Sequence, residues 1–298
     1  MVDPSYDDTL PLGNVNPPIG PASAAAGASF PVVLPKTESE VAEAKLPAIP
    51  WPENVFICGT PFSCVDMAGA VELADAIVAH RKPRYMVTAN VNYLMLEREQ
   101  PHLREISRHA AVMLADGKPI VWRSKISSNP LPERVAGSDL IVELAELASK
   151  RGYRVFFLGG AESVARTAAS ELKYRFPDLK IAGCYSPPFR QLTDEEHEKM
   201  LTRIRDAETD ILLVAFGQPK GEFWIYDNLQ ALGVPLSIQL GASFDFLAGT
   251  AKRAPVIWQK LGCEWLYRAL SDPARLLPRY AKNLWFVLTT MSRDILNR

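Results

Sequence analysis

One carboxylate in the chain stands where α/β proteins commonly carry out chemistry. Asp116 ends the apolar run of residues 110–115 and is followed at once by Gly117. An Asp-Gly pair after a strand is often only a turn, because Asp hydrogen-bonds its own backbone and Gly tolerates positive φ. Ligands of open α/β sheets, however, bind at the carboxyl ends of the strands. Asp116 is therefore a candidate for either role, and as a reagent it would be a general base.

Neutral polar residues end another apolar run. Thr88 and Asn90 close the run of residues 84–90, and Asn92 lies near the start of the helical pattern that follows. Hydroxyl and amide groups can hydrogen-bond the hydroxyls of a sugar without attracting every anion, so Thr88 and Asn90 are candidate sugar contacts. Asn is also a favoured N-cap residue, and Asn92 is expected to cap the helix.

Two glycine-containing turns join later strands to helices. Gly159 and Gly160 form the first, and Gly217 and Gln218 belong to the second. A helix N-terminus behind such a turn can receive a phosphate group, although each turn could also be only a tight connection. Neither turn completes a G-x-G-x-x-G or P-loop pattern, which disfavours NAD-dependent and ATP-hydrolysing enzymes. Two such turns in one sheet favour a nucleotide-sized ligand.

The sequence lacks the common metal and nucleophile motifs. No Asp-x-Asp triplet is present to hold a divalent ion on a nucleotide diphosphate, so arginines and backbone amides would have to balance its charge. No His ends a strand, and the four cysteines lack metal-site spacing. We therefore expect no metal and no cofactor, and Asp116 as the base. The candidate diphosphate ligands are Arg134, Arg268, Arg275 and Arg279.

Alternating apolar runs and helical patterns must position these residues. The alternation predicts βαβ units, and hence a Rossmann-like, mostly parallel sheet with helices on both faces. Strands are expected over residues 54–59, 84–90, 110–117, 153–160, 179–185, 210–217 and 235–241. Helices are expected over residues 66–80, 92–109, 138–150, 161–176, 194–206 and 221–232.

The two ends of the chain differ from its middle. Residues 1–50 are rich in Pro, Ala, Gly and Ser and show no structural period, which predicts a disordered arm before an α/β domain over residues 51–250. The first residues lack the basic start and apolar core of a signal peptide, and no apolar segment approaches the ~20 residues of a membrane span. The net charge of −1 argues against nucleic-acid binding. We expect a cytoplasmic protein.

Residues 251–298 carry nine basic and three acidic residues on a helical pattern with apolar stripes. A basic amphipathic segment with aromatic residues suits an anionic membrane surface, or an anionic ligand over which it closes. The same stripes could instead pack into the core or between copies of the chain, as in a homo-oligomer. The membrane-surface interpretation predicts that residues 251–298 form an appendage that associates with the inner face of the cytoplasmic membrane.

The chain resembles the bacterial WecG/TagA/CpsF glycosyltransferase family over about residues 55–282. The motifs that carry the resemblance are "TANVNYL", "LADGKPIVW", "ERVAGSDLI", "VFFLGG", "DILLVAFGQPKGEFWI", "LGASFDFLAGTAKRAP" and "CEWLYRALSDPARLLPRY". The resemblance implies a UDP-sugar donor, inversion at the anomeric carbon without a metal, and a polyprenyl-diphosphate-linked sugar as acceptor. It also implies a role in the synthesis of exopolysaccharide, teichoic acid or common antigen.

The resemblance assigns roles to individual residues. It implies that Asp116 is the general base, and that Asp245 in "SFDFLAG" contacts the nucleotide base. Two positions depart from the family pattern. Gly221 stands where the family's Pro-x-Gln-Glu usually has Gln, and Pro278 replaces the first Arg of an Arg-Arg pair. Further implied contacts of the donor or the active site are Thr88, Asn90 and Arg134, and those of the diphosphate are Arg268 and Arg275.

The sequence therefore predicts a UDP-sugar-dependent glycosyltransferase that acts on a lipid-linked acceptor. Because the Gln and Arg of the family pattern are replaced, a non-catalytic module that binds a nucleotide sugar or a lipid on the same scaffold is the alternative. A Rossmann oxidoreductase is disfavoured by the missing glycine fingerprint. The two leading readings differ in whether UDP is released from a UDP-sugar.

Overall fold

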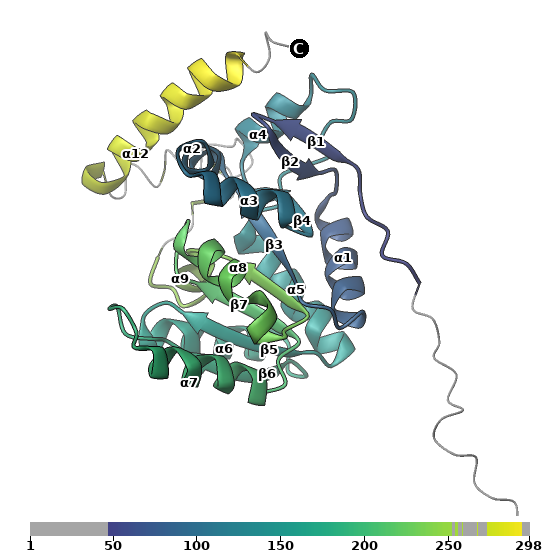
Figure 1. The fold of residues 1–298 in the computed structure, drawn as a ribbon, viewed down its shortest axis with the longest axis vertical. Coiled ribbons are helices and arrows are strands. Elements are labelled where there is room, and N and C mark those ends of the chain that lie inside the picture. The colour runs from purple at the N-terminus through teal and green to yellow at the C-terminus, as the bar shows by residue number, and fades with distance from the viewer. Residues whose placement is uncertain (1–46, 252–253, 256–257, 259–266, 268–272, 294–298) are drawn as a thin grey trace, which may run out of the picture. The chain divides into compact units, whose positions relative to one another are not determined.

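A six-stranded parallel sheet forms the centre of the protein (Figure 1). The computed structural model describes residues 47–251, 254–255, 258, 267 and 273–293. The strand order is β4-β3-β8-β7-β5-β6, and every ladder in this sheet is parallel. This confirms the expected α/β class. The strands are β3 (Arg84–Ala89), β4 (Val112–Ala115), β5 (Arg154–Gly159), β6 (Lys180–Tyr185), β7 (Ile211–Ala215) and β8 (Leu236–Gln239).

Helices cover both faces of the sheet (Figure 1). Successive residues of a strand point to opposite faces, so Phe156 packs in one core and Phe157 in the other. This double burial explains why the strands read as continuous apolar runs. The first core is covered by α2 (Val91–Glu99), α3 (Pro101–His109), α7 (Asp194–Asp206) and α8 (Lys220–Leu232). The second is covered by α1 (Met67–Ala79), α5 (Gly137–Arg151), α6 (Glu162–Arg175) and α9 (Ser243–Leu247).

The first predicted strand lies outside this sheet. Residues 54–59 were expected to join the parallel sheet, but β1 (Asn54–Ile57) pairs antiparallel with β2 (Thr60–Ser63) in a separate hairpin. Cys58 and Gly59 between them have φ of 53° and 86°, as a two-residue turn with two left-handed residues requires. The hairpin contacts the main sheet through Ser63, whose hydroxyl accepts a hydrogen bond from the Met113 amide at 3.2 Å.

The helix predicted over residues 92–109 is two helices. Gln100 between α2 and α3 is extended, with φ −125° and ψ 101°. The residue before a proline is disfavoured in the α-helical region, and Pro101 begins α3. A further helix that the sequence did not predict, α4 (Lys118–Ser124), follows Asp116. Gly117 is its N-cap, with an extended φ of 177°, a backbone conformation that any residue can adopt.

Near the C-terminus, α12 (Pro273–Phe286) continues into η2 (Val287–Met291) (Figure 1). The segment is attached to the α/β body because Phe286 is buried in the first core and Arg98 of α2 donates a hydrogen bond to the Thr290 hydroxyl at 2.7 Å. Pro278, which replaces an Arg of the family pattern, lies inside α12. Among the described residues, no helix has the length and apolar character needed to span a membrane.

Candidate active site

The carboxyl ends of β3 and β4 bring Asp116 beside Asn90. Ala89 and Ala115 are partners in the parallel ladder, and the Asp116 amide donates to the Ala89 carbonyl at 2.9 Å. Thr88, one residue earlier, is 5% exposed, and its hydroxyl donates to the Gln239 carbonyl of β8 at 3.4 Å. Three predicted site residues therefore lie along the ends of two neighbouring strands.

Arg134 reaches the same edge from the loop between α4 and α5. The amide of its neighbour Val135 donates to the Ala115 carbonyl at 3.0 Å, which fixes this loop against the end of β4. The Arg134 guanidinium lies 3.6 Å from the Asp139 carboxylate, and its side chain is 17% exposed. The loop thus places the backbone beside Arg134 at the end of β4, one residue before Asp116.

Asn90, and not Asn92, is the N-cap of α2. The Asn90 side-chain oxygen accepts a hydrogen bond from the Tyr93 amide at 3.2 Å, and Asn90 has the extended backbone of a cap residue. Asn92 is instead buried in the first turn of the helix. The helix begins immediately after β3, so its cap lies two residues earlier in the chain than predicted. The cap holds Asn90 at the strand end, beside Asp116.

The two glycine turns differ in what their glycines do. Gly159 has φ +99°, and a Cβ there would lie 2.8 Å from the Ala215 carbonyl oxygen and 2.8 Å from the Phe216 ring. Glycine is therefore required at this position for close packing of β5 on the end of β7. Gly160 has φ +71° and donates its amide to the same carbonyl at 3.0 Å. Gly217 has φ +77°, and a Cβ there would meet nothing within 4 Å, so this turn is open.

Gln218 connects the second turn to β3. Its amide nitrogen donates to the Thr88 carbonyl at 3.1 Å. Because Thr88 also bonds β8, the ends of β3 and β8 and the turn after β7 form one network of neutral groups. Such a network can hold a ligand in position without adding charge.

Glu222 is a functional candidate that the sequence reasoning missed. It stands in the first turn of α8 and is 2% exposed. Neither carboxyl oxygen makes a hydrogen bond of normal geometry. Burial raises the pKa of Glu222 to about 8, although its own backbone amide and the Gln218 side chain oppose the rise. Glu222 is therefore mainly neutral at pH 7. Helical spacing places it on one stripe with the buried Ile225 and Leu232, a signal that could have revealed its burial.

The other predicted residues lie in α9, in α12 and, for Arg268, outside the described region. Asp245 in α9 is partly exposed, and its carboxylate accepts a hydrogen bond from the Thr250 hydroxyl at 3.2 Å. Arg275 and Arg279 fall within α12. Arg268 lies outside the described residues. In the part of the chain that the structure describes, no group of three or more His, Cys, Asp or Glu residues could hold a metal ion.

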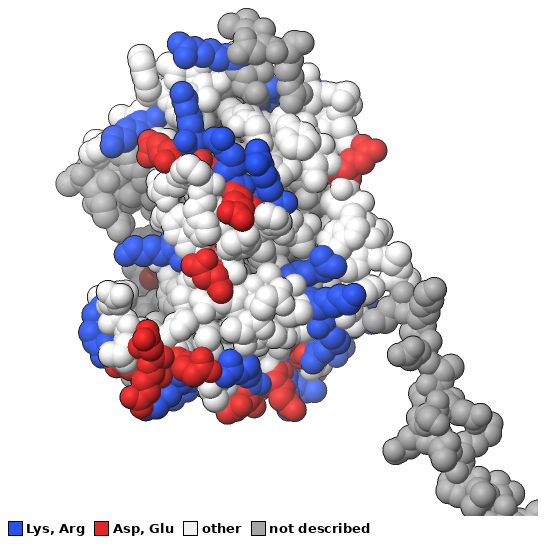
Figure 2. All heavy atoms as spheres, viewed as in Figure 1, with Lys and Arg blue, Asp and Glu red and all other residues white. Residues whose placement is uncertain are grey.

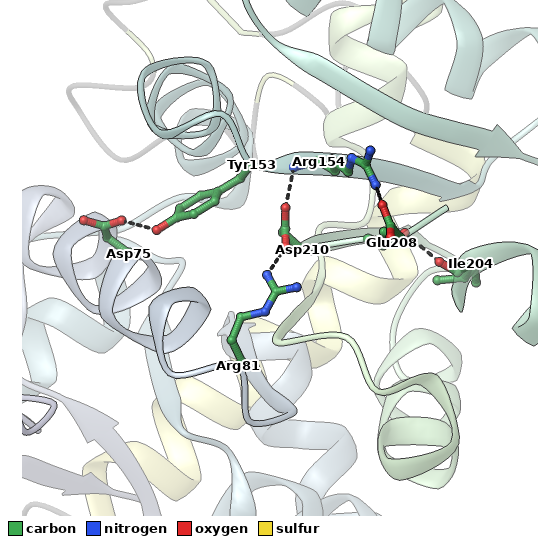
Figure 3. A network of polar contacts seen from close by, with 8 residues as sticks. Asp75, Arg81, Tyr153, Arg154, Ile204, Glu208 and Asp210 are labelled. Atoms are coloured by element: carbon green, nitrogen blue, oxygen red, sulfur yellow. Dashed lines mark hydrogen bonds and ion pairs between the residues drawn. The ribbon is translucent and has the colours of Figure 1, made fainter. Parts of the chain in front are cut away.

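A second polar region lies at the opposite, amino edge of the sheet. There a cavity of about 490 Å³ is lined by residues that include Arg81, Arg154 and Arg205. Asp210 joins two of these elements, because its carboxylate pairs with Arg81 and accepts from the Arg154 amide at 2.8 Å (Figure 3). Arg154 also pairs with Glu208. The charges of this region thus compensate one another, as expected of a structural network.

The outer surface beyond this edge is similarly mixed. Figure 2 shows basic and acidic side chains interspersed where α7 lies. The ion pairs there join neighbours, as Lys199 does with Glu195 and Arg205 with Glu198, both at 2.6 Å. Exposed pairs of this kind contribute about 0–1 kcal/mol each. The surface is therefore typical of a solvated helix and shows no one-sided field that would attract a ligand.

Comparison with known families is decisive for the class of protein. The model of the glycosyl transferase WecG/TagA/CpsF family matches residues 55–298. The chain belongs to this family. It is a glycosyltransferase, as the sequence predicts, and the match includes both the sheet edge that carries Asp116 and the segment that contains α12.

Two relatives of this glycosyltransferase carry names that state an activity. A Bacillus spizizenii protein is 33% identical over 203 residues, which cover 68% of this chain and 77% of the relative. A Staphylococcus aureus protein is 32% identical over 228 residues, which cover 75% of this chain and 87% of the relative. Each relative is named an N-acetylglucosaminyldiphosphoundecaprenol N-acetyl-beta-D-mannosaminyltransferase.

Proposed function

We propose that this glycosyltransferase transfers a sugar from a UDP-sugar to a polyprenyl-diphosphate-linked sugar, with inversion and without a metal. The observation that carries the proposal is the position of Asp116. Its amide bonds the end of β3, next to Asn90 and Thr88, at the sheet edge where α/β proteins bind ligands. A carboxylate there can accept a proton beside neutral groups that suit sugar hydroxyls.

In the proposed reaction, Asp116 accepts the proton of the acceptor hydroxyl as that oxygen attacks the anomeric carbon. The bond between this carbon and the diphosphate oxygen breaks, and UDP leaves with the bonding electron pair from the opposite side. One carbon–oxygen bond forms on the face opposite to the one that breaks, in a single displacement, so the configuration inverts. General-base assistance of this kind contributes roughly 10²- to 10⁴-fold to the rate.

Arginines would stabilise the diphosphate that develops charge as UDP leaves. Arg134 is a candidate for this role within the α/β body, because its loop is anchored to the end of β4, one residue before Asp116. Arg268, Arg275 and Arg279 remain predicted ligands from the C-terminal segment. Guanidinium groups suit this role because they remain charged and can donate two hydrogen bonds to one phosphate. No divalent ion is then needed to offset the charge.

The relatives suggest which substrates to test first. Their names describe transfer of N-acetylmannosamine to N-acetylglucosamine on an undecaprenyl diphosphate. We propose the same chemical classes for this chain, a UDP-activated sugar and a lipid-linked amino sugar. With these substrates, the enzyme would take part in the synthesis of a cell-surface polysaccharide.

We further propose that the enzyme binds the inner surface of the cytoplasmic membrane through α12 and η2. The exposed fractions of Leu284, Trp285 and Leu288 are 53%, 70% and 60%. Lys282 and Arg293 are exposed on the same segment. Apolar and basic side chains together favour the surface of an anionic bilayer, where a prenyl-linked acceptor would be found.

The test is an assay of UDP release over a panel of UDP-sugars, with and without a prenyl-diphosphate-linked N-acetylglucosamine acceptor. We expect acceptor-dependent release with UDP-N-acetylmannosamine, resistance to EDTA, and an inverted anomeric configuration in the product by NMR. Binding of UDP-sugars without release from any of them would contradict the proposed reaction and favour a binding module.

A further inference from the structure

The side chain of Gln239 fills the space beside Gly221, one of the two positions that depart from the family pattern. Gly221 is in the first turn of α8, and glycine has a lower helix propensity than alanine. A Cβ at this position would lie 2.5 Å from Cδ and 3.0 Å from Cγ of the Gln239 side chain, and closer still to the end of its amide. Residue 221 therefore has to be glycine while Gln239 keeps this conformation.

The Gln239 side chain is buried at the end of β8, with a residue exposure of 2%. When its amide nitrogen faces the Val214 carbonyl, the two atoms are 2.7 Å apart. The side-chain oxygen then accepts from the Gly217 amide at 3.1 Å and the Gly241 amide at 3.2 Å. One carboxamide thus joins the end of β7 to the turns that follow β7 and β8.

These bonds reach other candidate site residues. Gly217 directly precedes Gln218, whose side chain bonds the Thr88 carbonyl, and the Thr88 hydroxyl bonds the Gln239 carbonyl. Gln239 is therefore connected to Thr88 in two ways. Its main-chain carbonyl bonds the Thr88 hydroxyl directly, and its side chain is linked to Thr88 through Gly217 and Gln218 in the turn after β7. The Gly217 amide already donates to the Gln239 side chain. Gly217 would therefore help nucleotide binding through the open space at its turn, and not by donating its N–H to the ligand.

We propose that Gln239 is a positioning residue that sets the turns of the nucleotide pocket, and that Gly221 provides the space in which its side chain lies. The proposal rests on the proposed function in placing the UDP part of the donor at this edge. It assigns to Gln239 no contact with the reacting atoms. Its consequence is that residues 221 and 239 act as one unit, so neither can be changed without altering the effect of changing the other.

The experiment compares wild type with Gly221→Ala, Gln239→Ala and the double variant, and measures both Tm and the Kd for UDP. In the wild-type background, overpacking by the new methyl group should lower Tm by roughly 5 °C and weaken UDP binding at least about fivefold. In the Gln239→Ala background, Gly221→Ala should leave Tm unchanged or raise it, because the space is then empty and alanine favours the helix. The loss of Tm seen in the wild-type background should therefore disappear or become a gain.

Further variants distinguish positioning from packing. Gln239→Ala alone should raise the KM for the UDP-sugar more than it lowers kcat, and Gln239→Glu, which cannot donate to Val214, should not restore KM. Gly69→Ala in α1 is the matched control, because its new Cβ would meet the Asp66 carboxylate at 3.2 Å, away from the pair. Its effect should be the same in both backgrounds.

The outcomes separate this inference from the proposed function. An equal loss of Tm from Gly221→Ala in both backgrounds would overturn the complementarity. A reversal in Tm with the same UDP affinity in all four proteins would overturn the positioning role. If the Gly221→Ala protein does not fold, the double variant decides the question. A folded double variant would support the complementarity of residues 221 and 239, and an unfolded one would contradict it. The measurements of Tm and of the Kd for UDP need no turnover, so an inactive wild type would refute the proposed function alone.

Discussion

The two edges of the central sheet carry polar residues of different kinds. At the amino edge, arginines and carboxylates pair with each other, as Arg81 does with Asp210 and Arg154 with Glu208. At the carboxyl edge, the buried polar groups around Thr88 are neutral amides and hydroxyls, and Glu222 is mainly neutral at pH 7.

This difference separates groups that stabilise the fold from groups that can receive a ligand. The arginines Arg81 and Arg154 of the amino edge are held in direct ion pairs with Asp210 and Glu208, whereas Arg134 at the carboxyl edge lies 3.6 Å from Asp139. A buried network of neutral donors and acceptors, in contrast, adds no charge of its own to repel a nucleotide. We therefore expect changes at the carboxyl edge to alter catalysis and binding as well as stability, and changes at the amino edge to alter stability alone.

The largest effect is expected from Asp116→Asn. The variant keeps the shape of the side chain but cannot accept the proton, so kcat should fall by at least about a hundredfold. Tm and the Kd for UDP should stay close to wild type, because the backbone bond to Ala89 is retained. Steady-state kinetics and calorimetric titration test this. Near-normal turnover would exclude Asp116 as the base and remove the main functional distinction between the edges.

A smaller effect is expected at the membrane. Changing Leu284, Trp285 and Leu288 to Ser removes apolar side chains from an exposed surface, and binding to anionic vesicles should weaken on the order of tenfold to a hundredfold. Sedimentation with phospholipid vesicles measures the change. Tyr174→Ser and Phe189→Ser are matched controls, since these side chains are 84% and 91% exposed on other elements, and they should have no effect. Unchanged sedimentation of the triple variant would refute the membrane role.

At the amino edge, Asp210→Asn should destabilise the protein without affecting the chemistry. The Asp210 carboxylate bonds Arg81 and the Arg154 amide, and loss of charged hydrogen bonds typically costs about 1.5–3 kcal/mol. Denaturant unfolding would measure the loss. Glu171→Gln, which removes an exposed pair with Arg175, should cost less than about 1 kcal/mol. A change in kcat of the folded Asp210→Asn protein would show that the amino edge also serves the reaction.

The smallest effect concerns Glu222 and pH. The pKa of this carboxyl is about 8 in the folded protein and about 4.3 in an unfolded chain, so the folded state binds more protons between these values. Stability conferred by the neutral form is present at low pH and declines as pH rises toward 8. Between pH 6 and pH 7, Glu222→Gln should gain up to about 1.4 kcal/mol relative to wild type. A pH-independent difference between the two proteins would show that Glu222 is ionised when folded.

The sequence was sufficient to predict most of the fold, because parallel strands covered on both faces leave continuous apolar runs. Six of the seven expected strands form the main sheet. The exception was residues 54–59, whose Cys58-Gly59 turn folds them into a hairpin. A short apolar run does not reveal its partner, so this antiparallel pairing could not be predicted from the run alone.

The candidate site was predictable where a residue follows a strand directly. Asp116, Thr88 and Asn90 share an edge because the ends of neighbouring parallel strands do. Gln239 was missed because its partners, Val214 and the Gly217 amide, are more than twenty residues away in the sequence. Such contacts depend on the packing of whole elements, which local patterns do not specify.

A crystal structure with UDP would show which edge of the sheet binds the nucleotide. We expect electron density for UDP at the carboxyl edge, over the open turn at Gly217 and toward Asp245, and none in the cavity at the amino edge. UDP bound in that cavity, against Arg81, Arg154 and Arg205, would refute the assignment of the donor site to the carboxyl edge.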